Sequence, residues 1–143
     1  MATAETSAVF NCTPEEFYKI VSDYEKYPEF LKEVTACHVL REENGKKLVE
    51  FSLSLMKTFS YTLWMKEEPT KKVLWEFGSG DIFKFNSGSW EITDEGGKAR
   101  ASYKLEVEFT LFVPKFIANG LVSVNLPNMI SSYQKRVSDL YKK

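Results

Sequence analysis

The sequence predicts an α+β fold: a curved antiparallel sheet of about seven strands wraps a long C-terminal helix, with two short helices after the first strand. Three observations support this. Apolar and polar residues alternate through the middle of the chain, short turn signals separate the alternating segments, and helical spacing returns after Pro114. Strands joined by tight turns form hairpins, so the sheet is antiparallel. With 143 residues and no break in composition, we expect one domain over residues 1–143.

A first strand is expected over residues 3–10, followed by a helix that starts at Thr13. The Thr13 side chain can cap the free N–H groups, Pro14 fits the first helical position, and Glu16 completes a capping box. Aromatic residues then cluster around Pro28, which predicts a second short helix interrupted before that proline.

Alternation of period two begins after Val34 and gives each strand one apolar and one polar face. Turn signals between the strands lie at residues 44–45, 69, 78–80 and 96–97. The apolar rows are Val49, Phe51, Leu53 and Leu55; Phe59, Tyr61, Leu63 and Met65; Val73, Trp75 and Phe77; Trp90 and Ile92; and Ala101, Tyr103, Leu105, Val107 and Phe109.

The last element is predicted to be one helix from Pro114 to about Tyr141, with Pro127 bending it from inside. About 26 helical residues span roughly 39 Å, which is enough to cross the sheet.

The apolar face of the sheet and the apolar stripe of the helix must cover each other, and a twisted sheet curls around a rod. The space between them is filled either by large side chains or by a ligand, and the aromatic content of 15% suits both. The residues predicted to line such a ligand-binding cavity are Phe51, Leu53, Tyr61, Leu63, Trp75, Phe77, Trp90, Tyr103, Leu105, Val107, Leu121, Val124, Met129 and Tyr133.

The composition argues against several classes of function. A net charge of −1, from 19 basic and 20 acidic residues, argues against direct DNA binding. Cys12 and Cys37 read as free thiols, and no spacing of Cys and His residues indicates a metal or a cofactor. We find no apolar leader and no membrane span, so we expect a cytoplasmic protein.

Evidence for catalysis is weak. Tyr61 and Tyr103 lie in inward rows, where a buried phenol needs a partner: backbone, water, or a ligand oxygen such as a quinone carbonyl. His38 is either structural or a polar group of the pocket, and it cannot act with Cys37 because neighbouring strand residues face opposite sides. We therefore assign no catalytic residue, and whether the protein is an enzyme stays open.

The order of elements and three segments resemble a known superfamily. The segments are residues 14–18 with 21–31 (Asp-Tyr-x-x-Tyr-Pro-x-Phe), residues 80–92, and residues 129–136. The chain is similar to the START/Bet v 1-like (SRPBCC) superfamily with its helix-grip fold. Within it, the chain resembles the polyketide cyclase/dehydrase family, which includes coenzyme Q-binding proteins and ribosome-association toxin proteins.

The resemblance implies a carrier or chaperone that binds a lipid or an isoprenoid quinone-like molecule between the sheet and the C-terminal helix. A transient membrane contact is compatible with that role. One alternative is a regulatory protein of the toxin type that associates with a ribosomal subunit. A second alternative is a polyketide cyclase-like enzyme, for which Tyr61, Tyr103 and His38 are the residues to test.

Overall fold

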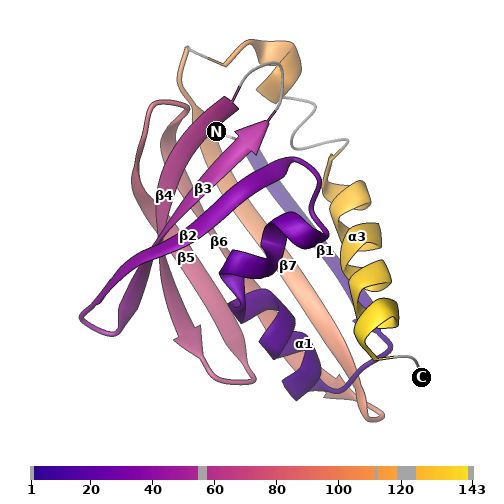
Figure 1. The fold of residues 1–143 in the computed structure, drawn as a ribbon. Helices are drawn as coiled ribbons and strands as arrows, with labels where there is room; N and C mark the ends of the chain where they lie inside the picture. The colour runs from indigo at the N-terminus through magenta and orange to yellow at the C-terminus, as the bar shows by residue number, and fades with distance from the viewer. Residues whose placement is uncertain (1, 55–57, 112, 119–124, 142–143) are drawn as a thin grey trace.

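The computed structural model describes residues 2–54, 58–111, 113–118 and 125–141 (Figure 1). Seven strands, two α-helices and one 3₁₀ helix have assigned bounds within these ranges. In chain order they are β1 (Ala2–Phe10), α1 (Pro14–Ser22), the 3₁₀ helix η1 (Tyr24–Glu29), β2 (Val34–Glu43), β3 (Lys46–Ser54), β4 (Thr58–Glu68), β5 (Lys72–Gly80), β6 (Phe83–Glu95), β7 (Lys98–Phe109) and α3 (Asn125–Leu140).

All seven strands belong to one antiparallel sheet with the order β1-β7-β6-β5-β4-β3-β2. The sheet is strongly curved, and α1 and α3 lie on its concave side (Figure 1). The first strand pairs with the last, and α1 and η1 connect the two edge strands β1 and β2. The predicted fold class, a sheet that wraps the C-terminal helix with two short helices after the first strand, is confirmed.

The predicted start of α1 is also confirmed. The Thr13 hydroxyl accepts a hydrogen bond from the Glu16 N–H at 3.2 Å, and the Glu16 carboxylate accepts one from the Thr13 N–H at 2.9 Å. The prediction that the second helix stops before Pro28 is wrong, because η1 runs through Pro28 to Glu29. The φ angle that proline imposes is also the φ angle of a 3₁₀ helix, so the ring fits there without strain.

Three of the four predicted turns are confirmed, including the one at Pro69, where residues 69–71 form the turn between β4 and β5, and one is wrong. Asn44 and Gly45 have φ angles of 51° and 77°, and the 96–97 turn likewise has two positive φ angles. Residues 78–80 are not a turn but the end of β5. Gly78 is needed there because a Cβ atom at this position would overlap the Thr62 side chain on β4.

The predicted C-terminal helix is found over Asn125–Leu140. Residues 115–118 are helical as well, and the predicted residues 119–124 lie outside the described residues. Pro127 is the third residue assigned to α3. Because residues 119–124 lie outside the described ones, one continuous helix from Pro114 and its bend at Pro127 stay predictions.

Gly88, in the middle of β6, lets Trp75 lie on the concave face of the sheet. Gly88 pairs with Trp75 on one side and with Leu105 on the other. A Cβ atom at Gly88 would overlap both the Lys104 carbonyl oxygen and the Trp75 indole. The indole therefore takes the space that a side chain would fill.

We predict that Gly88→Ala lowers the free energy of unfolding by about 2 kcal/mol, because a backbone carbonyl must move to admit the methyl group. Urea denaturation measures the change. Ser87→Ala on the same strand is the control and should change stability by less than about 0.5 kcal/mol. Equal stability of the two variants would contradict the assignment of Gly88 as the position that makes room for the indole.

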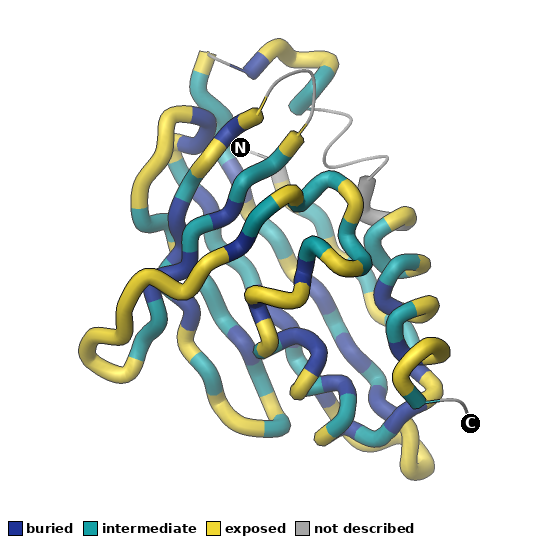
Figure 2. Tube along the Cα trace, viewed as in Figure 1, coloured by how far each residue is buried: buried dark blue, intermediate teal, exposed yellow. Residues whose placement is uncertain are grey.

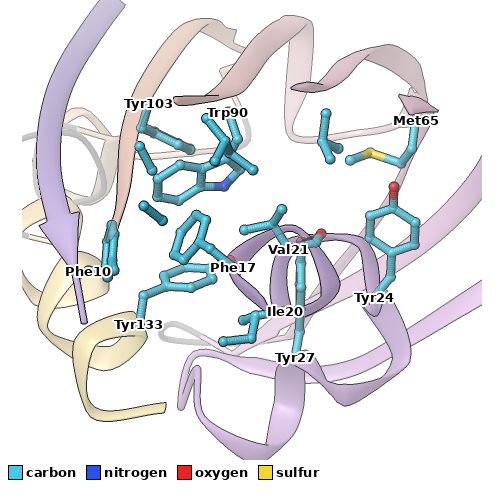
Figure 3. Close-up of a cluster of buried hydrophobic side chains, with 14 of the residues drawn as sticks. Phe10, Phe17, Ile20, Val21, Tyr24, Tyr27, Met65, Trp90, Tyr103 and Tyr133 are labelled. Carbon is cyan, nitrogen blue, oxygen red and sulfur yellow. Dashed lines mark hydrogen bonds between the residues drawn. The ribbon is translucent and has the colours of Figure 1, made fainter. Parts of the chain in front are cut away.

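One end of the interior is packed solid. Phe17 of α1 stacks on Phe10 with ring centroids 4.3 Å apart, and it meets Trp90 at 5.3 Å and Tyr133 of α3 at 6.0 Å (Figure 3). Exposed residues gather instead at the hairpin tips and on the outer sides of the helices (Figure 2). Among the described helices, none is long and apolar enough to cross a membrane.

Candidate functional site

Next to this packed end, the concave face encloses a cavity of about 530 Å³. Its walls come from all seven strands, from η1 and the segment after it, and from α3. This volume is within the range of natural small-molecule sites. The curved sheet and the helix therefore leave room that the aromatic side chains do not fill.

The structure brings eleven of the predicted lining residues together around this cavity. These are Phe51, Leu53, Tyr61, Leu63, Trp75, Trp90, Tyr103, Leu105, Val107, Met129 and Tyr133. Phe77 is not among the lining residues and packs beside Phe83, with ring centroids 6.3 Å apart. Leu121 and Val124 lie outside the residues whose side chains are described.

Sequence reasoning did not name several lining residues. Asn86, Met65 and Phe109 follow the inward rows of their strands, so the alternation alone contained enough information to find them. Tyr27 reaches the cavity from η1, residues 31–33 reach it from an irregular segment that has no periodic signal, and Val34 reaches it from the start of β2. The others that were not named are Ala4, Phe83, Asn128 and Ser132.

The cavity reaches solvent between the segment after η1 and the first turns of α3. Lys32 and Asn128 line it and are exposed, and Glu33 and Ser132 stand beside them. Among the described lining residues, Lys32 and Glu33 are the only charged ones. Charge is therefore confined to the mouth, and the interior presents rings, aliphatic side chains and a few neutral polar groups.

Two of the lining tyrosines have partners in the protein. The Tyr27 hydroxyl donates to the Val21 carbonyl oxygen, and the Tyr133 hydroxyl interacts with the Tyr27 hydroxyl and the Trp90 indole. Burial raises the pKa of both phenols above the ordinary tyrosine value. These two groups stay neutral and hold the inner wall together.

Tyr61 and Tyr103 differ from that pair, since no described residue forms a hydrogen bond with either hydroxyl. Burial raises the pKa of both phenols, and Tyr103 adds to the effect on Tyr61, so the two phenols lie near each other. Each therefore presents a neutral O–H group inside an apolar cavity.

Apart from Lys32 and Glu33 at the mouth, the described lining residues place no acid beside a base. Their interior polar groups are phenols, the indoles of Trp75 and Trp90, and the Asn86 amide. His38 lies exposed on β2 and does not line the cavity, whereas its neighbour Cys37 is buried and its pKa is raised to about 12 by burial. His38 and Cys37 thus face opposite sides of the strand, as predicted. The geometry fits binding better than proton transfer.

Comparison with known families gives a match over most of the chain. The family model described as "Polyketide cyclase / dehydrase and lipid transport" matches residues 11–132. These residues run from the end of β1 into α3 and include most of the cavity wall.

Individual proteins are similar over nearly their full length. The ribosome association toxin RatA of Escherichia coli is 24% identical, over 99% of this chain and 90% of that protein. A START superfamily protein from Mycobacterium smegmatis has a TM-score of 0.83 at 19% identity, covering 96% of this chain and 98% of that one. A Thermus thermophilus protein gives 0.84 at 20% identity, covering 98% and 99%.

Proposed function

Because the chain belongs to the polyketide cyclase/dehydrase and lipid transport family, we propose that it binds an apolar small molecule between the sheet and α3. The ligand is of the lipid or isoprenoid quinone type, and the protein acts as its carrier or chaperone. No metal or cofactor is part of this proposal.

The observation that supports this proposal is the cavity of about 530 Å³ beside a fully packed core. Because the cavity reaches solvent, its apolar wall stays in contact with water, and this costs roughly 25 cal/mol per Å² compared with a closed core. The wall is apolar, and its charges lie at the mouth. Burial of an apolar ligand recovers free energy at about 25 cal/mol per Å².

The direct test is native mass spectrometry of the purified protein, with solvent extraction and identification of co-purifying molecules. We expect an apolar adduct at one per chain, or binding of added quinones and lipids in titrations followed by tryptophan fluorescence. Trp75 and Trp90 line the cavity, so their emission should respond to a ligand. An unliganded mass, together with no response to either ligand class, would overturn the proposal.

A cavity-blocking variant sharpens this test. Leu53→Trp with Leu105→Trp places two indoles into the cavity from β3 and β7. Ligand affinity should fall on the order of 100-fold, because the apolar surface that the ligand would bury is already covered. The control Leu105→Ala enlarges the cavity and should keep binding. Thermal unfolding of both variants checks that the fold persists.

A second candidate function is association with ribosomal particles. It is favoured by the similarity to RatA, a protein named as a ribosome association toxin, over 99% of this chain. Sedimentation through a sucrose gradient with ribosomal subunits at low salt tests it. Absence of the protein from the ribosomal fractions would remove this candidate, and the cavity-blocking variant shows whether the two functions depend on each other.

A further inference from the structure

Three neutral hydrogen-bond donors line the apolar cavity and have no acceptor among the described residues. Every fully buried side-chain nitrogen or oxygen of the described residues has a hydrogen-bond partner. The hydroxyls of Tyr61 and Tyr103 have none, so they must keep accessible surface, and both residues line the cavity. Their accessible surface therefore faces the space that a ligand would occupy.

The third donor is the amide nitrogen of Asn86, a residue that is only 4% exposed. The Trp75 Nε1–H group donates to the Asn86 Oδ1 atom at 3.2 Å. An indole N–H can only donate, so this bond fixes which end of the amide is oxygen. The Nδ2 group has no hydrogen bond with any described residue, and Asn86 lines the cavity.

These donors belong to one neighbourhood of the wall. The rings of Tyr103 and Trp75 are 5.6 Å apart, and the same indole holds the Asn86 amide. Tyr103 lies close enough to Tyr61 to raise the pKa of the Tyr61 phenol, and the Tyr61 ring lies 4.9 Å from that of Phe83. Aromatic rings therefore lie around these three polar groups.

We propose that Tyr61, Tyr103 and Asn86 anchor the oxygen of a neutral carbonyl group carried by the apolar ligand. A ketone, quinone, ester or amide oxygen accepts hydrogen bonds from such donors. A carboxylate does not fit as well, because the only cation among the described lining residues is Lys32, which stands at the mouth. This inference rests on the proposed function and names the chemical class that the cavity selects.

The test compares two variants and two probes. Tyr61→Phe and Tyr103→Phe each remove one donor and keep the ring. The two neutral probes are a medium-chain ketone and the alkane of equal length, and the alkanoate of that length is an anionic control; all are titrated by tryptophan fluorescence and checked by native mass spectrometry. Each variant should weaken ketone binding roughly ten-fold and leave alkane binding unchanged. Tyr18→Phe, which removes a phenol outside the cavity, should change neither.

The outcomes separate this inference from the proposed function. Suppose that the wild-type protein binds both the ketone and the alkane. If the variants keep both affinities, or lose both equally, the carbonyl anchor is absent and the apolar binding site is still supported. If the alkanoate of equal length loses more affinity than the ketone in the variants, the donors hold an anion and the inference is wrong. If the wild-type protein binds no probe, the proposed function itself fails. Each variant is tested singly, so that one misfolded variant leaves the other informative.

Discussion

The free energy of unfolding should fall steeply above about pH 10, because five buried tyrosines must stay neutral in the folded protein. Burial raises the pKa of all five above the ordinary value of about 10, so the unfolded chain releases these protons first. The unfolded state then binds fewer protons than the native state, and stability declines as pH rises. The five are Tyr24, Tyr27, Tyr61, Tyr103 and Tyr133.

The size of this effect follows from linkage. Each such tyrosine removes about 1.4 kcal/mol per pH unit above its unfolded-state pKa. Cys37, whose pKa burial raises to about 12, adds a similar contribution from about pH 9 upward. Below their unfolded-state pKa values, these groups contribute their full share to the free energy of unfolding. That contribution is lost as the pH rises toward their raised native pKa values.

Urea denaturation between about pH 8 and pH 11, with phenolate absorbance as a second readout, measures the decline. Tyr24→Phe provides a matched variant, because its hydroxyl donates to Glu67 at 2.7 Å at the edge of the core. This variant should be less stable at neutral pH and should show a shallower alkaline slope. Constant stability up to pH 11 would contradict the burial of these phenols.

Phe17→Ala is expected to cost about 3–5 kcal/mol of stability, which is a large part of what a domain of this size has. The Phe17 ring is fully buried, and it joins α1, β1, β6 and α3 through Phe10, Trp90 and Tyr133. Removing it opens a void among rings that cannot collapse easily. Thermal or urea unfolding measures the loss.

The comparison for this variant is Phe116→Ala. Phe116 is 68% exposed, so its truncation should change stability by less than about 0.5 kcal/mol. If both variants lose a similar free energy of unfolding, the packing around Phe17 does not contribute the stability that we expect from it. Phe17→Ala protein that remains folded should still bind apolar ligands, because Phe17 does not line the cavity.

The sequence by itself determined which side of each strand faces inward. Tyr61, Trp75 and Tyr103 stand on the concave face because alternation has a period of two and a slip of one residue would expose the whole row. The start of α1 was equally clear, since Thr13 and Glu16 form a local motif within four residues. Local patterns of this kind need no knowledge of the rest of the chain.

Only the tertiary structure decided where the interior is packed and where it is hollow. Phe51 and Phe77 look alike in the sequence as inward aromatics of strands, yet Phe51 lines the cavity and Phe77 packs beside Phe83 without lining it. The polar role of Asn86 was also invisible, because it depends on Trp75 reaching it across the space that Gly88 leaves. Side chains distant in sequence meet only when the sheet curls, so their contacts, and the cavity between them, belong to the folded molecule.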